Sequence, residues 1–501
     1  MHANRWIRGL WAALLSSVLL AGCGSTVVNP VTGREERTVM DEATEIAEGK
    51  KAHEQVLAEY GVYANPRLQA YVNEVGQKLA RQSHRSQLAW TFTVLDSPEI
   101  NAFALPGGYV YVTRGIMAYL DSEAELAGVI GHEIGHVTAR HGAQRATRQQ
   151  DAGLGVLAAT VLGAVLESQG VGGATDLAGQ VSQGVAAGWL ATYSREQELQ
   201  ADQLGAEYLA RNRYDPNNMV DVIGVLKNQE RFAADLAKSE GRAAPSGANW
   251  LSSHPSNDQR LADIKRIAAG YQGDYSDDGR TRYLQAIDDM SFGESRAQGV
   301  VRGRNFFHEE LGIALTAPQG WGIRNSEQAI TVVNAAGDAG LIVQLVPAKA
   351  GRTHEEIIRN VVKPTEGRTA QLNIHGLAAT EFTGSRRNAQ GQSQPVRVLL
   401  VNGPENRNYL LHRGARDAAT LQRAAAPLAE AEASFRPLTA ADRAAARPWT
   451  LNTVSFPRGG FAELARSSPL PTQAEAQLRL INSAYAGSAQ PRPGQAVKVV
   501  L

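Results

Sequence analysis

The chain has 501 residues, which at about 100–200 residues per domain predicts two to four domains. Its hydrophobic fraction of 43% is typical of a globular protein and excludes wholesale disorder. Lysine plus arginine equals aspartate plus glutamate at 50 each, so the formal net charge is zero, which argues against a general nucleic-acid binder because such a protein needs a basic excess.

The first 22 residues are typical of a secretory signal. Arg5 and Arg8 precede an apolar run, Leu10 to Leu20, which is shorter than the roughly 20 residues that span a bilayer. The segment ends in Leu-Ala-Gly-Cys23, which resembles the bacterial lipobox, where the cysteine is acylated and becomes the first residue. We therefore predict a signal peptide over residues 1–22 and a lipid anchor on Cys23; the alternative is a simple signal peptide followed by a chance cysteine.

Cys23 is the only cysteine in the sequence. No disulfide can therefore form within one chain, and any metal must be held by nitrogen and oxygen. The next residue is Gly24 rather than aspartate. By resemblance to enterobacterial sorting, this favours the periplasmic face of the outer membrane over the inner membrane.

Residues 24–40 are small and polar and, with Cys23, are predicted to form a lipidated tether (23–40). Residues 41–295 are predicted to form one domain that combines helices with a short sheet. Apolar spacing and turn signals predict helices at 41–60, 66–83, 122–141, 195–211, 216–237, 258–269 and 277–290, and strands at 90–95, 101–104 and 108–113, the last two joined by a Pro106-Gly107 turn.

An HExxH motif lies in the predicted helix 122–141, at His132-Glu133-Ile134-Gly135-His136. Two histidines four residues apart share one helix face, so both imidazoles can reach one zinc ion at about 2.0–2.1 Å. Glu133 projects beside the metal, where it can take a proton from bound water. The alternative is a solvated helix face, which the scarcity of histidine, 11 in 501 residues, disfavours. Gly131 and Gly135 are weak helix formers, so we expect close packing there, against a neighbouring strand.

A catalytic zinc needs three protein ligands and one open position, and the third ligand is expected on another element. The segment YSREQELQAD (193–202) begins a predicted helix in which Glu198 and Asp202 are four residues apart on one face. Glu198 can supply the carboxylate ligand, and Asp202 can accept a hydrogen bond from a ligating histidine and fix its tautomer. Taken alone, this segment is a charged surface helix, and only the HExxH motif favours a site.

Over about residues 40–295 the sequence resembles the HtpX-like zinc metallopeptidase family, in particular its periplasmic BepA- and LoiP-like lipoprotein branch. Four segments carry the resemblance in order: NAFALPGGYVYV (101–112), HEIGH (132–136), YSREQELQAD (193–202) and SSHPSNDQR (252–260). The pairing of HExxH with ExxAD implies a gluzincin fold with Glu198 as the third ligand. The resemblance also implies an edge strand near 101–104 that pairs with the substrate backbone, which fits an endopeptidase of loose sequence preference.

Three further residues are candidates for the site. His254 matches the family's downstream histidine, which either stabilises an oxyanion or occupies the open metal position and holds the enzyme inactive. An ordinary loop histidine before a proline is the third reading. Asn101 is a candidate oxyanion donor, and Arg195 is expected to pair with carboxylates beside the site.

Residues 153–166 form an uncharged run that is too short to span a bilayer. We expect a buried helical hairpin there. The alternative, favoured by its glycines, is a lid or membrane-contacting loop over the cleft.

After a predicted linker at 296–304, short alternating apolar runs predict that residues 305–440 form an α+β accessory domain with no recognisable chemistry. BepA-like relatives have a helical repeat domain at this place, so partners of that repeat do not carry over. The order of segments in residues 449–501 resembles a LysM-like βααβ module, which in other proteins binds peptidoglycan.

The sequence thus predicts an α+β protein: a mainly helical gluzincin-type peptidase domain with a small sheet, an α+β domain and a LysM-like unit. We expect a zinc-dependent endopeptidase, with one Zn²⁺ per chain, that cleaves misfolded or unassembled envelope proteins. One rival is a chaperone-like assembly factor for outer-membrane proteins, although an inactive scaffold is expected to lose Glu133 or a ligand. The other rival is a peptidoglycan-binding protein that acts through the C-terminal module.

Overall fold

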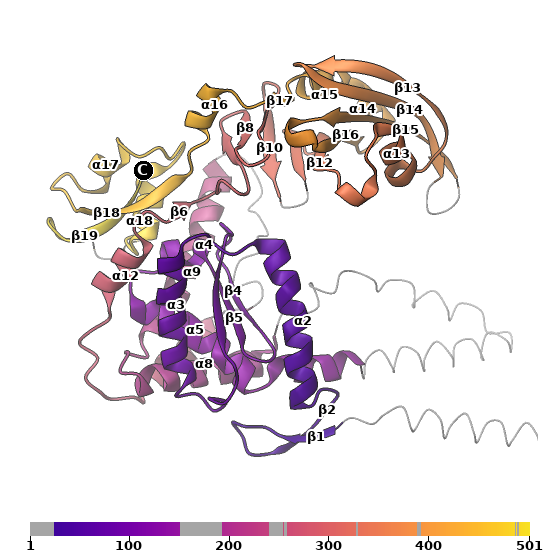
Figure 1. The fold of residues 1–501 in the computed structure, drawn as a ribbon. Helices are drawn as coiled ribbons and strands as arrows, with labels where there is room; N and C mark the ends of the chain where they lie inside the picture. Colours follow the sequence, from indigo (N-terminus) through magenta and orange to yellow (C-terminus); the bar gives the residue numbers. More distant parts are fainter. Residues whose placement is uncertain are drawn as a thin grey trace, which may run out of the picture. The chain divides into compact units, whose positions relative to one another are not determined.

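The computed structural model describes residues 25–150, 193–239, 254, 258–326, 329–387, 392–485, 487 and 490–501. Cys23, the predicted signal peptide and the run at 153–166 lie outside the described residues. The chain divides into two compact units: unit 1 comprises Met1–Met290 and Leu451–Leu501, and unit 2 comprises Ser291–Thr450 (Figure 1). Within the described residues, no helix is both long and apolar enough to cross a membrane.

Unit 1 combines helices with short strands, in keeping with the predicted α+β class. Residues 141–150 are helical. The other elements before residue 290 are β1 (Ser25–Val28), β2 (Glu35–Thr38), α2 (Glu42–Tyr60), α3 (Pro66–Ala80), β3 (Thr91–Leu95), β4 (Ala102–Leu105), β5 (Tyr109–Thr113), α4 (Arg114–Tyr119), α5 (Glu123–Thr138), α8 (Arg195–Arg211), α9 (Asn218–Ser239), α11 (Asp258–Ala268) and α12 (Arg280–Ile287).

The stretch predicted as a tether contains a β-hairpin, which corrects that prediction. β1 pairs antiparallel with β2. The side chain of Asn29 accepts the Val31 N–H at 2.9 Å and donates to the Ala139 carbonyl at 3.3 Å. Polar side chains of this kind stabilise turns by bonding the backbone, so a polar composition is compatible with an ordered hairpin.

Helix α5 carries the HExxH motif and packs closely on α8. Its N-cap is Ser122, whose Oγ accepts the Glu125 N–H at 3.1 Å, and every residue of the helix is buried. A Cβ on Gly135 would lie only 2.9 Å from the Ala201 carbonyl oxygen of α8. The close packing predicted at the glycines is therefore against a helix rather than a strand, and it brings the two helices that carry the candidate ligands side by side (Figure 1).

The small sheet of unit 1 has the strand order β3-β5-β4. β3 runs parallel to β5, and β4 runs antiparallel to it. Gly107 and Gly108 form the turn between β4 and β5 with φ of 84° and 100°, a backbone region that favours glycine. In the described part of the chain β4 pairs on one side only, so the 101–104 region is an edge strand.

The C-terminal segment has the predicted βααβ order. Its elements are β18 (Trp449–Ser455), which begins in unit 2, α17 (Gly460–Ala465), α18 (Ala474–Ile481) and β19 (Ala496–Val500). β18 and β19 pair antiparallel. From Leu451 onward this segment belongs to the same compact unit as the HExxH helix.

Unit 2 is rich in strands. Its larger sheet is antiparallel in the order β10-β11-β12-β16-β15-β14-β13, and a smaller sheet has the order β17-β9-β8-β7. Leu341, Leu411, Leu428 and Phe435 belong to one core that joins the sheets to a helix. The elements are β6 (Ser291–Phe292), β7 (Val300–Arg302), β8 (Asn305–His308), β9 (Ile313–Thr316), β10 (Trp321–Asn325), β11 (Ile330–Asn334), β12 (Ala339–Leu345), α13 (His354–Ile357), β13 (Pro364–Ile374), β14 (Leu377–Arg387), β15 (Ser393–Asn402), β16 (Asn408–Ala415), α14 (Ala418–Arg423), α15 (Ala425–Ala433), β17 (Arg436–Pro437) and α16 (Ala440–Ala445), with short turns of 3-10 or π-helix between some of them.

Candidate metal centre

The HExxH motif places both of its histidines on one buried face of α5. His132 and His136 are almost completely buried, and their Nε2 atoms lie 3.0 Å apart. Glu133 is also fully buried on the same helix. The pair of imidazoles therefore points toward a single place in the interior of unit 1.

Glu198 reaches the same place from α8. The helix begins with a capping box between Ser194 and Gln197, so its first turn, which ends at Glu198, is well fixed. The carboxylate oxygens of Glu198 lie 3.6 Å from His132 Nε2 and 3.5 Å from His136 Nε2. The structure thus brings the three predicted ligands together from two helices.

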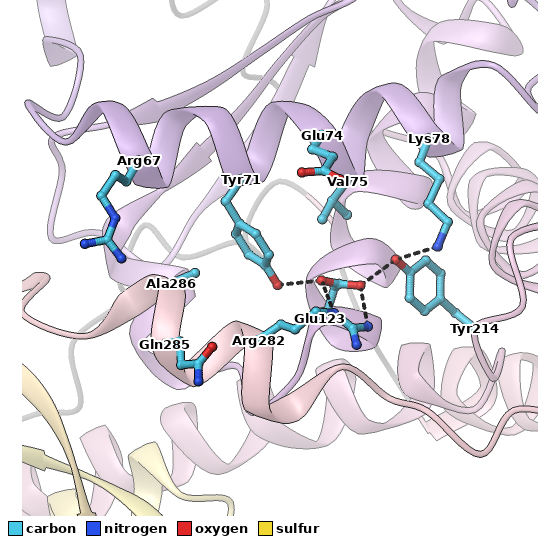
Figure 2. Close-up of a pocket in the computed structure, with 10 residues that line it drawn as sticks. All are labelled: Arg67, Tyr71, Glu74, Val75, Lys78, Glu123, Tyr214, Arg282, Gln285 and Ala286. Atoms are coloured by element: carbon cyan, nitrogen blue, oxygen red, sulfur yellow. Dashed lines mark hydrogen bonds and ion pairs between the residues drawn. The ribbon is translucent and has the colours of Figure 1, made fainter.

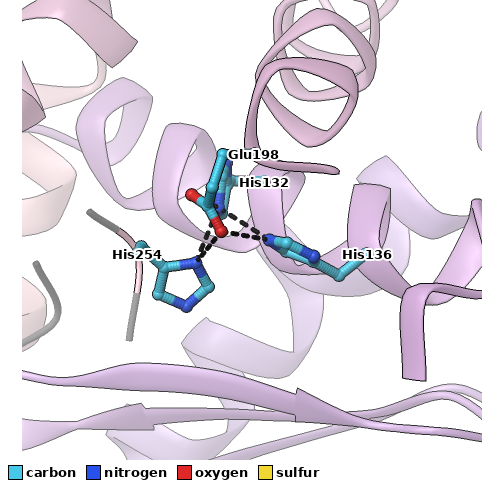
Figure 3. Close-up of side chains that lie close together, drawn as sticks. All are labelled: His132, His136, Glu198 and His254. Atoms are coloured by element: carbon cyan, nitrogen blue, oxygen red, sulfur yellow. Dashed lines mark hydrogen bonds and ion pairs between the residues drawn. The ribbon is translucent and has the colours of Figure 1, made fainter. Parts of the chain in front are cut away.

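His254 supplies a fourth donor atom (Figure 3). Its Nδ1 lies 3.2 Å from His132 Nε2 and 3.0 Å from a carboxylate oxygen of Glu198. Its Nε2 lies 3.4 Å from Glu133 Oε1. Burial lowers the pKa of His254, but the charges of Glu198 and Glu133 outweigh burial and raise the pKa above its ordinary value.

The histidine ligands are oriented by further buried groups. His132 Nδ1 lies 2.8 Å from a carboxylate oxygen of Asp202, one turn after Glu198. His136 Nδ1 lies 2.9 Å from Nδ1 of His141, whose Nε2 lies 2.9 Å from the side-chain oxygen of Gln200. Burial lowers the pKa of His141 to about 4, so this ring is neutral at pH 7 and can accept a hydrogen bond.

These contacts decide which ring nitrogens carry protons. If Nδ1 of His132 donates to Asp202 and Nδ1 of His136 donates to His141, both Nε2 atoms present lone pairs to the same point. Two lone pairs 3.0 Å apart repel unless a cation lies between them. The hydrogen-bond network therefore prepares the cluster for a metal.

The spacing of the donors fits zinc. Four ligands at about 2.0–2.1 Å in a tetrahedron are about 3.3 Å apart. The five donor distances given above run from 3.0 to 3.6 Å, and all four donor atoms lie within 4.8 Å of one another. Two histidines and a glutamate are a ligand set of catalytic zinc sites. The residues present thus suit one zinc ion held by His132, His136 and Glu198, with His254 at the fourth position.

Sequence reasoning missed the role of Arg260, which lies on α11 and links the two carboxylates. Its guanidinium lies 2.8 Å from Asp202 Oδ2 and 2.8 Å from Glu198 Oε2, and it donates to the His254 carbonyl at 2.9 Å. Burial raises the pKa of Asp202, but the charge of Arg260 and the hydrogen bonds from Arg260 and His132 together outweigh burial and lower the pKa. The only signal for Arg260 in the sequence was its place in the 252–260 segment.

The other predicted residues lie outside the four-residue cluster. Asn101 immediately precedes β4, and its side-chain oxygen is buried without a hydrogen-bond partner among the described residues. Arg195 is the exposed first residue of α8. Tyr193, which the sequence did not mark, stacks on the His136 ring with 3.9 Å between the ring centroids.

Comparison with known proteins gives a family for part of the chain. Residues 66–268 match the model of peptidase family M48. The beta-barrel assembly-enhancing protease of Yersinia pestis is 28% identical over 272 residues, which cover 51% of this chain and 53% of that protein. Its counterpart in Escherichia coli (strain K12) is 27% identical over 252 residues, 49% of this chain and 47% of that protein.

A mitochondrial protein is also similar to part of this chain. The mitochondrial metalloendopeptidase OMA1 of Schizosaccharomyces pombe is 32% identical over 219 residues, 43% of this chain and 58% of that protein. The chain thus spans about half the length of the curated relatives it matches.

Proposed function

We propose that this chain, whose residues 66–268 match the model of peptidase family M48, is a zinc-dependent endopeptidase of the bacterial envelope. The observation that carries the proposal is the meeting of His132, His136 and Glu198 from two helices, with Glu133 beside them. We further propose that its substrates are misfolded or unassembled envelope proteins, by analogy with relatives named as beta-barrel assembly-enhancing proteases.

The proposed chemistry is hydrolysis of a peptide bond by water. Zinc, when bound, supplies a Lewis acid that makes water a better nucleophile and polarises the scissile carbonyl. Glu133 is the proposed general base, because its buried carboxylate lies next to the fourth position, where His254 now sits. The same carboxylate then passes the proton to the leaving amine.

The edge strand β4 is the proposed binding site for the substrate backbone. It pairs with β5 on one side only within the described residues, so its other side can accept an extended peptide. Main-chain hydrogen bonds of this kind select extended conformation rather than sequence. An unfolded segment satisfies this requirement, whereas a folded domain does not.

His254 is proposed to be a latch on the site. Its Nδ1 lies as close to His132 and Glu198 as the ligands lie to one another, which supports the role of a fourth ligand over that of an oxyanion donor. A zinc ion held by these residues would have His254 at the position that water and substrate need. Cleavage would then require the His254 side chain to leave this position.

Replacing His254 by alanine should therefore raise the rate of cleavage. If His254 has left the site in about one wild-type molecule in ten, kcat/KM rises about tenfold, because every molecule of the variant has the fourth position free for water and substrate. The rate is measured on an unfolded protein substrate, with Asn217→Ala, a substitution on an exposed turn, as control. A loss of about 10²–10³ in kcat would instead identify His254 as an oxyanion donor and contradict the latch.

The endopeptidase proposal is tested by metal removal. The wild type and the His254→Ala variant are incubated with an unfolded protein, with and without a zinc chelator. We expect the chelator to abolish cleavage and added zinc to restore it, because the proposed mechanism needs the metal as its Lewis acid. Absence of cleavage by both proteins, or cleavage that the chelator leaves unchanged, would contradict the proposal.

We also propose that Cys23, which lies outside the described residues, carries a lipid anchor that holds the protein at the periplasmic face of the outer membrane. The support is the lipobox-like Leu-Ala-Gly-Cys23 sequence with the only cysteine of the chain. The β1–β2 hairpin begins two residues later, so the anchor is joined closely to unit 1. Mass spectrometry of the N-terminal peptide checks the acylation.

A further inference from the structure

Lys498, on the strand β19, lies next to the start of the HExxH helix α5. Lys498 of β19 is only 1% exposed. Its Nζ donates to the carbonyl oxygens of Leu120 at 2.6 Å and Ala118 at 3.1 Å, and it lies 3.1 Å from Asp121 Oδ1. The ammonium group therefore makes two hydrogen bonds and one ion pair with the end of α4 and the loop that leads into α5.

The same loop is held by other charges. Arg280 of α12 pairs with Asp121 at 3.2 Å and donates to the Ala496 carbonyl of β19 at 3.1 Å. The Asp121 N–H donates to Glu125 of α5 at 2.7 Å. Burial, and then the charge of Asp121, raise the pKa of Glu125 to about 8, so Glu125 is mainly uncharged at neutral pH and Asp121 is the acid that pairs with Lys498.

A second set of contacts holds the first residue of α5 (Figure 2). Glu123 accepts hydrogen bonds from the hydroxyls of Tyr71 and Tyr214, at 2.9 and 2.8 Å, and from Arg282 at 3.0 Å. A cavity of about 700 Å³ opens beside these residues. Since the carboxylate of Glu123 is already occupied by these donors, its evident role is to fix the helix rather than to bind a ligand.

The C-terminal segment is joined to unit 1 at several other points. The Asn482 side chain bonds both the N–H and the carbonyl of Lys498, each at 2.8 Å, and so fixes β19 to the end of α18. The Leu451 N–H donates to the Met290 carbonyl at 2.8 Å. The Tyr485 hydroxyl donates to Asp235 of α9 at 2.8 Å. The last two contacts join the segment to the rest of unit 1, and a module that only binds glycan would not need them.

The loop is rigidly connected to the candidate metal ligands. Ser122, directly after Asp121, caps α5, and His132 lies ten residues farther along the same helix, about 15 Å at 1.5 Å per residue. Glu198 lies on α8, the helix on which α5 packs. A shift of α5 relative to α8 by about 0.5 Å is enough to spoil a catalytic geometry.

We propose that residues 451–501 are a built-in part of the peptidase unit, and that Lys498 is a positioning residue that sets α5 against α8. This inference rests on the proposed function, because it concerns the helix that carries Glu133 and two proposed zinc ligands. The C-terminal segment thereby affects the metal centre indirectly, through the position of α5.

The test uses the full chain with Lys498→Met, and with Lys50→Met, an exposed lysine of α2, as the matched control. We expect amide hydrogen exchange across residues 123–138 to become at least about tenfold faster, and the affinity for zinc to fall at least about tenfold. The Lys50 variant should match the wild type. A lysine that only stabilises its own surroundings would speed exchange at residues 118–122 and 496–500 but leave residues 126–138 and zinc affinity unchanged, and that result would overturn the inference.

If the methionine variant does not fold, Lys498→Arg and Asp121→Asn give the same test in milder form. Both keep part of the network and should produce smaller changes in the same direction. Zinc affinity and exchange are measured without substrate. A chain that binds zinc and responds to these substitutions, yet cleaves no protein, would therefore refute the proposed function and leave this inference standing.

Discussion

Replacing Glu133 by glutamine is expected to lower kcat for peptide-bond cleavage by about 10²–10⁴-fold and to leave zinc binding unchanged. Glutamine has nearly the same size and fills the same buried place, but its amide cannot accept a proton from water at neutral pH. Because Glu133 is not among the four donor residues, the ligands stay intact. The measurement pairs the cleavage rate with the zinc content of the same sample.

The matched control for this substitution is Glu196→Gln, which changes an exposed glutamate at the start of α8. We expect wild-type cleavage from the control. A Glu133→Gln protein that cleaves unfolded protein as fast as the wild type would show that this carboxylate is not the base.

Replacing Glu198 by alanine is expected to remove zinc and activity together. The loss in zinc affinity should exceed the about 10–100-fold that loss of a supporting residue costs, because a direct ligand disappears. His132 and His136 remain, and His254 loses the Glu198 carboxylate that lies 3.0 Å from its Nδ1. The measurement is therefore repeated in the His254→Ala background, where only two ligands from one helix remain, and two ligands do not hold a catalytic zinc. Isothermal titration with zinc measures the affinity, and Glu196→Ala provides the control on the same helix.

Arg260 is expected to keep the Glu198→Ala protein folded. With Glu198 gone, the guanidinium keeps Asp202 as its partner, so a folded protein is expected. Normal circular dichroism together with lost zinc binding would fit the account. Unchanged zinc affinity would show that another group completes the site.

The candidate metal ligands could be predicted from the sequence because their spacing is a local property of helices. His132 and His136, and likewise Glu198 and Asp202, are four residues apart, and a helix puts such pairs on one face whatever surrounds it. Spacing alone does not predict that α5 and α8 lie in contact. Gly135 allows this contact, because a side chain at position 135 would come too close to the Ala201 carbonyl oxygen of α8.

Other parts of the site depend on contacts between distant segments, which spacing does not encode. Arg260 joins Glu198 and Asp202 across some 60 residues, and apart from its place in the 252–260 segment nothing in the sequence distinguishes it from a surface arginine. His141 is similar, since its role depends on where His136 and Gln200 lie in space. The burial of Lys498 was least predictable, because lysine is rarely buried without partners and its partners lie some 380 residues away.

In the fold, too, features that depend on local sequence could be predicted, whereas features that depend on contacts between distant segments could not. The strands around residues 101–113 follow from local alternation and turns, and the βααβ order of the C-terminus was expected from the resemblance to LysM-like modules. The order of the seven strands in unit 2 does not, because β12 pairs with β16 after three intervening strands. The β1–β2 hairpin was missed because each strand has only four residues and lies in a stretch of mostly small and polar residues. Its order comes from turn hydrogen bonds and from contact with Ala139.

The most direct check of the account is the location of zinc in the purified full-length protein by X-ray anomalous scattering at the zinc absorption edge. A single ion is expected, at about 2.0–2.2 Å from one nitrogen each of His132 and His136 and one oxygen of Glu198. An ion bound elsewhere, or a crystal soaked in zinc in which these three side chains hold none, would contradict it.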